Sequence, residues 1–205
     1  MTRSNESRLT VFPTAQDLAP IQTLYDQGLY VQAWELSCAI GPLQTWRGAP
    51  GRVLAGRLAG HVGASRLSNI LHLRGWLEHQ DSPDALYYHV SAISSSRGPY
   101  PALEILQRHN HIAATGNTHI RASILCMQAV LMAHLRDFDQ AEGYIKSAQE
   151  ISPDDPWVWV EQAYIYETQD QYDAALQAAT DCAAIDSMVS SGHYICRSLF
   201  KVARP

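Results

Sequence analysis

Three histidines lie close enough together in the sequence to suggest a metal site. His109 and His111 form an H-x-H pair, and His119 follows eight residues later. Imidazole nitrogen is a common zinc ligand, but zinc sites usually draw four ligands from tighter motifs, and none is assembled around these residues. The pair falls where a predicted helix gives way to a loop, so we expect solvent-facing side chains. We therefore predict no metal ligand, and a metal-dependent hydrolase would rest on these histidines alone.

Other groups with potential chemistry lack the sequence context that catalysis or cofactor binding requires. Gly56, Gly60 and Gly63 match neither a dinucleotide-binding nor a Walker motif, so we interpret them as loose packing in a degenerate repeat. Residues 94–96 are serines that precede a Gly-Pro turn rather than forming a nucleophile elbow. Several carboxylates are expected on solvated helix faces: Glu161, Glu167, Asp170 and Asp173. We predict no catalytic residue, no cofactor and no enzyme.

Composition and charge narrow the class of protein. Of 205 residues, 46% are apolar and 17% are charged, as in a folded protein with extensive buried surface. The net charge of −5 hides a contrast: residues 47–121 carry eight arginines against four acids, whereas residues 122–189 carry twelve acids against two cations. Because the arginines are dispersed, we exclude nucleic acid as a partner. The acidic half either favours a partner with a basic flank or is a solvated outer face.

The sequence also bears on location and redox state. Residues 1–10 are polar and contain no secretory signal, and no apolar run approaches the ~18 residues of a membrane span. We therefore predict a cytoplasmic protein that does not bind membranes. The cysteines have no paired spacing, which predicts reduced thiols used as small core residues; they are Cys38, Cys126, Cys182 and Cys196.

The elements that must position these residues repeat with a period of thirty-four residues in the last third of the chain. Shifted by this period, Ala129 falls on Ala163, Phe138 on Tyr172, Asp139 on Asp173, Ala141 on Ala175 and Ala148 on Cys182. A period of this length is typical of stacked helix pairs, because one pair cannot bury its own apolar face. The sequence therefore predicts stacked helix pairs.

Helix boundaries follow from proline and from the apolar spacing. Helices are predicted over residues 122–135, 138–151, 156–167 and 171–185, with a break at Ser152-Pro153 and an N-terminal cap at Asp155. Their predicted inner faces are Leu125, Ala129 and Met132; Phe138, Ala141, Ile145 and Ala148; Trp159, Ala163 and Tyr166; and Tyr172, Ala175, Leu176, Ala179 and Cys182.

Weaker helix pairs are predicted upstream, at about residues 20–40, 50–79 and 83–114. The expected organisation is a flexible N-terminus over residues 1–13, degenerate pairs over 14–119, and two clear repeats plus a terminal helix over 120–205. We expect these parts to form one continuous solenoid domain. The terminal helix, from Gly192 to Ala203, is interpreted either as a cap or as the start of a longer array.

The two clear units resemble the tetratricopeptide repeat (TPR) family over residues 122–187. The family pattern has a bulky residue, then small and aromatic residues at fixed places, which here are Trp159, Ala163, Tyr166, Tyr172, Ala175 and Cys182. The preceding unit has Leu125, Ala129, Met132, Phe138, Ala141 and Ala148 at these places, with Leu125 one place late. The resemblance implies an all-α, right-handed solenoid, here of about five helix pairs plus the terminal helix. It also implies a non-enzymatic protein-binding function.

In this family, residues of the first helix of each pair line a concave groove that binds peptides. By resemblance, the groove here contains Met127, Val130, His134, Trp157, Val160, Glu161, Tyr164, Glu167 and Tyr194. Such a groove would be apolar and aromatic with an acidic edge, and would suit an amphipathic helix or an extended segment. It lacks the lysine, asparagine and arginine with which one TPR subclass grips a terminal carboxylate. The alternative is that this stripe packs on the helix from Gly192 onward, or on a second subunit in a homo-oligomer.

Two classes of function remain besides the histidine-based hydrolase. The first is a protein-interaction scaffold that binds a peptide or partner helix. The second is the N-terminal region of a larger enzyme or regulator, in which the repeats position partners or substrates. The sequence does not identify the partner.

Overall fold

The structure is a computed structural model that describes the backbone of residues 10–188 and the side chains of residues 10–182. The chain divides into two compact units, residues 1–80 and 81–205, which are described separately. In the described range, regular structure is helical apart from one isolated bridge between Val11 and Trp46. The predicted all-α class is therefore confirmed. That the helix pairs form one continuous solenoid stays a prediction.

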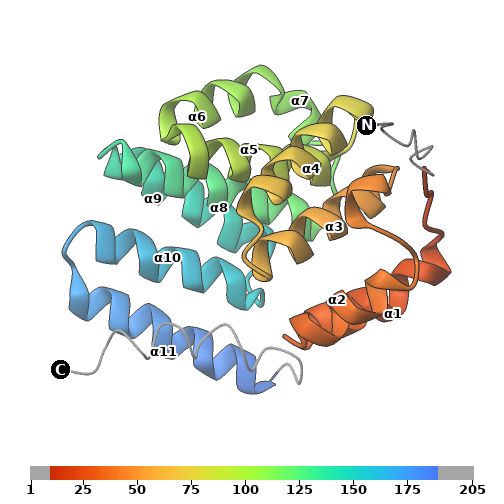
Figure 1. The fold of residues 1–205 in the computed structure, drawn as a ribbon. Helices are drawn as coiled ribbons and strands as arrows, with labels where there is room; N and C mark the ends of the chain where they lie inside the picture. Colours follow the sequence, from red (N-terminus) through yellow and green to blue (C-terminus); the bar gives the residue numbers. More distant parts are fainter. Residues whose placement is uncertain (1–9, 189–205) are drawn as a thin grey trace. The chain divides into compact units, whose positions relative to one another are not determined.

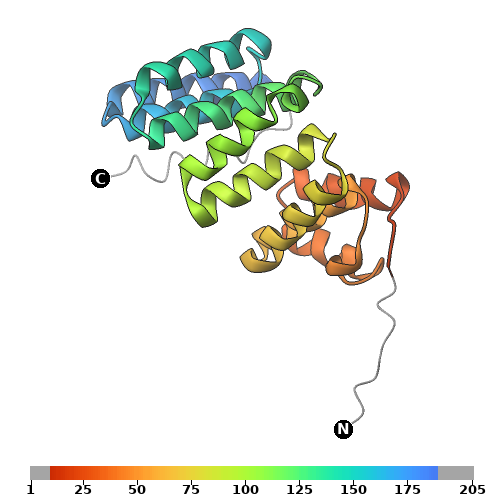
Figure 2. The ribbon, with the colours of Figure 1, turned by 90° about the horizontal axis from the view of Figure 1, so that it is seen from above.

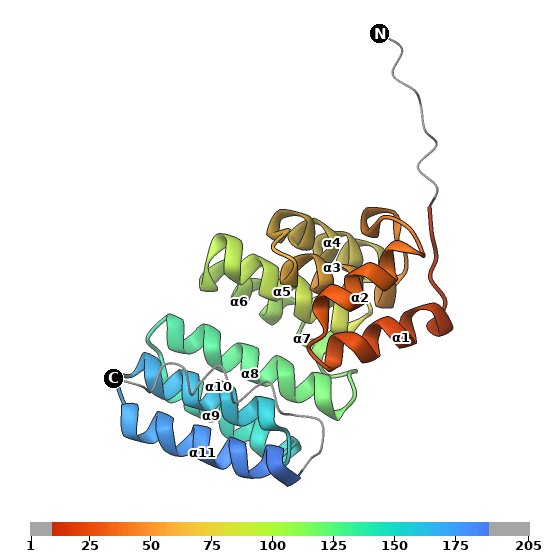
Figure 3. The ribbon, with the colours of Figure 1, turned by 60° about the horizontal axis from the view of Figure 1, so that its bottom comes forward.

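The first unit contains two helix hairpins joined by a short 3₁₀ turn. This unit is the red to gold part of the ribbon in Figure 3. Its elements are α1 (Ala15–Asp26), α2 (Tyr30–Cys38), η1 (Leu43–Thr45), α3 (Ala49–His61) and α4 (Ser65–Glu78). Ile21, Ala33 and Trp46 are fully buried at the centre of its core. The backbone of Val11 bonds to Thr45 and Arg47, so the chain from residue 10 onward is attached to this unit.

The second unit contains three hairpins, two of which are seen side by side in Figures 1 and 2. Its elements are α5 (Pro83–Arg97), α6 (Pro99–Arg108), α7 (Asn110–Ala113), α8 (Thr118–His134), α9 (Phe138–Ile151), α10 (Pro156–Thr168) and α11 (Tyr172–Met188). The five predicted pairs are therefore present, and the extra residues predicted before α8 form α7 and a short loop. The predicted terminal helix lies outside the described residues.

Side-chain caps explain where several helices begin. The hydroxyl of Ser82 and the carboxylate of Asp155 accept backbone N–H groups at the starts of α5 and α10, and a proline follows each of them. Proline suits the first helical position because its missing N–H would have no intrahelical partner there. Asn117 and Asp137 cap α8 and α9 in the same way. These capping residues set where the repeated hairpins start.

Each hairpin turns at one residue with a positive φ, and these residues are Gly28, Gly63, Gly98, Arg136 and Asp170. In four of the turns, all except Gly98, the turn residue donates its N–H to the carbonyl three residues back, and the next residue donates to the carbonyl five residues back. This is the Schellman closure of a helix. At Gly98 the next residue is Pro99, which has no N–H, so the second hydrogen bond of this closure cannot form there. Helix α6 begins at Pro99, directly after the turn.

Small residues recur at a fixed distance from these turns. Ala129 and Ala163 lie seven residues before their turn residues, and Gly56 occupies the same place in the α3–α4 hairpin. A Cβ on Gly56 would overlap the imidazole of His72, so α3 and α4 approach more closely than alanine would allow. The interpretation of Gly56 as loose packing is therefore wrong. It is a contact residue of the repeat.

Helix α8 lies at the centre of the second unit and contacts α5, α6, α7, α9 and α10. Its buried residues consequently surround the helix instead of forming one stripe: Ile120, Ala122, Ser123, Ile124, Cys126, Gln128, Ala129, Leu131, Met132 and Ala133. The prediction for α9 is confirmed at both ends, Phe138 and Ile151. Helix α8 begins four residues earlier than predicted because Asn117 caps it.

Two predicted inner faces need correction. Tyr172 and Leu176 of α11 are 63% and 50% exposed, whereas Ala178 and Ala179 are buried against Ala163 of α10. The match to the earlier repeat misled the prediction, because Phe138 at the place equivalent to Tyr172 is half-buried. In α10, Val158 and Ile165 are also buried, forming a second stripe that the predicted face omitted; they are 0% and 2% exposed.

Within the described residues, no helix combines the length and the apolar character needed to cross a bilayer. Cys126 and Cys182 are buried thiols, as predicted, whereas Cys38 is exposed. Burial raises the pKa of the Cys126 thiol, and the nearby carboxylates of Glu161 and Asp155 raise it further. This cysteine therefore stays protonated and acts as a small core residue.

Candidate partner-binding face

The predicted groove residues lie on two neighbouring helices of the second unit. Helix α10 packs on α8, and each contributes residues to what we call the α8–α10 face. These are Met127, Val130 and His134 of α8 with Trp157, Val160, Glu161, Tyr164 and Glu167 of α10. Tyr194, the ninth predicted residue, lies outside the described residues.

The α8–α10 face is partly open to solvent. His134 is exposed and Tyr164 is 37% exposed, while the other six side chains are half-buried. By contrast, Val158 and Ile165 of the same helix α10 are buried. Helix α10 thus has two stripes that pack within the unit and a third that packing leaves incompletely covered.

His134 and Tyr164 join the two helices at the exposed end of this face. The imidazole Nε2 and the phenol oxygen are 2.7 Å apart, and the rings meet edge to face with centroids 5.7 Å apart. An aromatic pair in this geometry is stabilising beyond its buried area. The contact holds Tyr164 in one orientation, with more than a third of its surface available to a partner.

Glu161 places a carboxylate among the apolar residues of the α8–α10 face. Its burial raises the pKa to about 7, because the ionised form loses hydration. Among the described residues no lysine, arginine or histidine forms an ion pair with it. A cationic group from a partner would stabilise the ionised form of Glu161.

A second link between α8 and α10 was not predicted from the sequence. The Nδ1 atom of His119 lies 2.9 Å from Oδ2 of Asp155, the residue that caps α10. Thirty-six residues separate the two in sequence, so only the repeat register could have suggested the contact. Its effect is to occupy the Asp155 carboxylate, which leaves Glu161 and Glu167 as the acids of the α8–α10 face.

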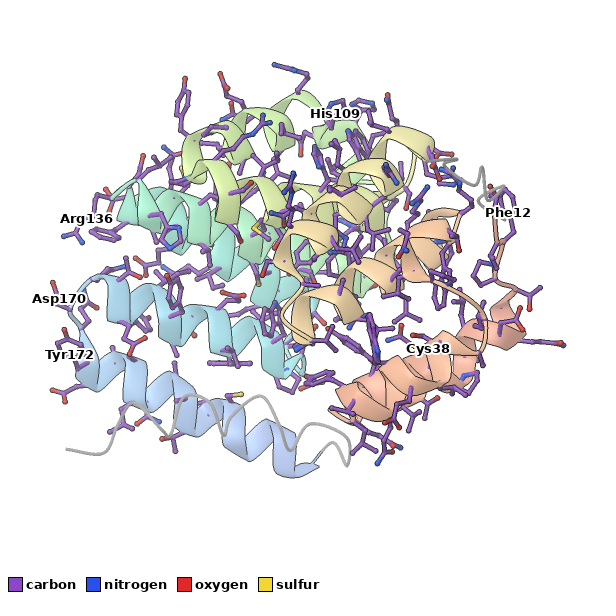
Figure 4. All side chains as sticks on the ribbon, viewed as in Figure 1. Phe12, Cys38, His109, Arg136, Asp170 and Tyr172 are labelled. Carbon is purple, nitrogen blue, oxygen red and sulfur yellow. The ribbon has the colours of Figure 1, made fainter. Side chains whose placement is uncertain are left out.

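Arg136 forms a third link between the two hairpins, at the turn end of the helices. Its Nη1 atom donates to the carbonyl of Thr168 in the last turn of α10, over 3.0 Å. Figure 4 shows Arg136 and Asp170, the two equivalent turn residues, at neighbouring hairpin ends. A guanidinium at a helix C-terminus donates to a carbonyl that has no partner within the helix, and its positive charge interacts favourably with the helix dipole.

The histidines that suggested a metal site do not converge. The rings of His109 and His111 have centroids 6.3 Å apart, and His119 faces Asp155 instead. Among the described residues, no three His, Cys, Asp or Glu side chains are grouped as metal ligands.

Comparison with solved structures places the chain among helical-repeat folds. MamA AMB-1 matches with a TM-score of 0.53 and 18% identity over 84% of this chain and 96% of its own. MamA MSR-1 matches with a TM-score of 0.50 and 17% identity over 84% and 96%. YrrB, described as a TPR protein with an unusual peptide-binding site, matches with a TM-score of 0.48 and 16% identity over 91% and 88%.

At these identities the likeness concerns the fold. The described hairpins, with their small residues at repeated places, have the TPR-like all-α fold that the sequence predicts. No family model matches the chain, and no curated protein matches it either.

Proposed function

We propose that this chain is a non-enzymatic, cytoplasmic scaffold whose α8–α10 face binds a peptide or a helix of a partner protein. The observation that carries the proposal is the incompletely covered third stripe of α10, which includes Trp157, Val160 and Tyr164. Half-buried aromatic side chains are typical anchors of protein interfaces, because they offer large apolar area at low entropic cost. The alternative, packing on residues from Gly192 onward or on a second subunit, would cover the same stripe.

We further propose that the bound segment carries a basic residue beside its apolar anchors. Glu161 lies among the apolar side chains without an ion pair in the described part of the chain, and Glu167 follows on the same side of α10. A lysine or arginine placed there would compensate the burial of the carboxylate.

Trp157→Ala and Tyr164→Ala test the face. Proteins captured by the wild-type chain are identified, and the affinity of the tightest partner is then measured by calorimetry. Loss of an aromatic anchor should weaken binding at least about tenfold. Tyr100→Ala is the matched control, because Tyr100 is 61% exposed on α6 and is not one of the residues of the face. Unchanged affinity in both face variants, with circular dichroism showing intact helices, would refute the assignment.

The basic flank is tested by pH. Below about pH 7 the Glu161 carboxyl is protonated and attracts no cation, whereas above it the carboxylate is ionised. Affinity for the partner should therefore rise as pH increases through about 7, and Glu161→Gln should remove that rise. A rise that persists in Glu161→Gln would show that Glu161 is not the group responsible for the pH dependence.

A further inference from the structure

A cavity of about 370 Å³ opens in the first unit, and none of its lining residues belongs to the α8–α10 face. Its walls come from the end of α4, from the segment around η1 and from the chain before α1. The lining residues are Thr10, Gln44, Thr45, Arg47, Arg74, Leu77 and Glu78. Backbone bonds from Val11 to Thr45 and from Arg47 to Val11, at 3.0 and 2.8 Å, hold two of these walls together.

The cavity is surrounded by more positive than negative charge. Glu78 accepts hydrogen bonds from Arg47 at 2.5 Å and from Arg52 at 2.7 and 3.3 Å. Burial alone would raise the pKa of Glu78, but these bonds outweigh it and hold the pKa below its usual value. The carboxylate is therefore ionised and already shared by two arginines.

Two arginine groups at this site, the Nη1 of Arg52 and the guanidinium of Arg74, are not compensated by an acidic side chain in the described range. The side chain of Arg52 is fully buried, and its Nη1 has no hydrogen-bond partner among the described residues. Arg74 lines the cavity, and no acidic side chain in the described range lies within ion-pair distance of it. With three arginines and one glutamate, the site has a net charge that favours an added anion.

An apolar stripe leads along α4 to this cavity. Ile70, Leu73 and Leu77 are 37%, 42% and 59% exposed and follow each other at spacings of three and four residues, so they share one face of the helix. Arg66 and Arg74 flank the same stripe. Leu77 also lines the cavity, so the stripe and the charged site form one continuous surface.

We propose that this surface binds an acidic peptide segment of a partner protein, with a glutamate or aspartate side chain in the cavity and apolar neighbours along α4. A carboxylate matches the planar donor fork of Arg74 in size and charge. A phosphate dianion is less suited, because its second charge would face the ionised Glu78. The apolar stripe distinguishes a peptide from a free small anion.

The test uses the full chain and a fluorescein-labelled octapeptide of alternating glutamate and leucine with blocked ends. Fluorescence anisotropy should show saturable binding that weakens at least about tenfold in Arg74→Gln, because a charge-assisted hydrogen bond is lost. Arg108→Gln is the matched control, since Arg108 is exposed on α6 of the second unit and does not line the cavity. It should bind within about twofold of wild type.

Three results would each overturn the proposal. The first is equal weakening in Arg108→Gln and Arg74→Gln, which would indicate a diffuse charge effect. The second is equal binding, or equal absence of binding, of this peptide and of a second peptide in which glutamine replaces every glutamate. The third is displacement of the peptide by inorganic phosphate as readily as by unlabelled peptide, which would indicate a site for free anions. Trp157→Ala should bind the peptide as tightly as wild type, because Trp157 belongs to the α8–α10 face and not to this surface.

Discussion

Gly56 shows how one hydrogen atom in place of a methyl group decides a helix–helix contact. The residue is buried in α3, and the imidazole of His72 occupies the space where a Cβ would lie. Since His72 is itself buried at 7% exposure, its ring has little room to move aside. The close approach of α3 and α4 therefore depends on this glycine.

Gly56→Ala should lower the free energy of unfolding by about 1–3 kcal/mol, because overpacking exceeds the gain in helix propensity. Gly143→Ala is the control: Gly143 is exposed in α9, and a Cβ there would meet no atom within 4 Å. It should raise the free energy of unfolding by about 0.5–1 kcal/mol. Urea unfolding of both variants measures the difference, and equal stability would show that His72 yields freely.

At the scale of the element, the hairpin turns carry the repeat more faithfully than the helices do. Gly28, Gly63 and Gly98 occupy the turn place that Arg136 and Asp170 occupy later, although no residue type is shared by all five. What is shared is the positive φ, which glycine adopts freely and other residues adopt at a cost. The three glycines could have been aligned from the sequence, but a search for identical residues passes over them.

Substitutions at two turns should have opposite signs. Gly63→Ala places a Cβ in open space at φ 86°, so only backbone strain acts, and stability should fall by about 1–2 kcal/mol. Asp170→Gly relieves a φ of 61° and should raise stability by about 0.5 kcal/mol, despite the lost bond to the Tyr172 hydroxyl. Thermal unfolding of both variants provides the check. A loss of stability in Asp170→Gly would show that this hydrogen bond outweighs the strain.

For the whole molecule, the sequence predicted the all-α fold class and the repeat period, but it did not predict which apolar residues would be buried by neighbouring helices. Ala163 and Tyr166 were correctly predicted to face the partner helix, because they match the small and large places of the repeat. The exposure of Tyr172 and Leu176 could not be predicted, since the period alone does not determine which side of the last hairpin is covered. The cavity beside Arg74 joins residues more than sixty positions apart, and no local motif marks it.

Cooperativity within the second unit should follow its contacts. Helix α8 contacts five other helices, whereas in the described range α11 makes substantial contact with α10 alone. Amide hydrogen exchange followed by mass spectrometry should therefore find the slowest exchange in α8 and faster exchange in α11. Equal protection of the two helices would mean that the unit opens only as a whole.

The join at Gly98 restricts how the architecture can be altered. A single residue ends α5 and begins α6, with φ 94° and ψ 175°, a combination essentially confined to glycine. Any tag, graft or circular permutation placed at this corner would disturb two helices at once. Residues 114 and 115, which are exposed and precede the capping residue of α8, are the more permissive place for engineering.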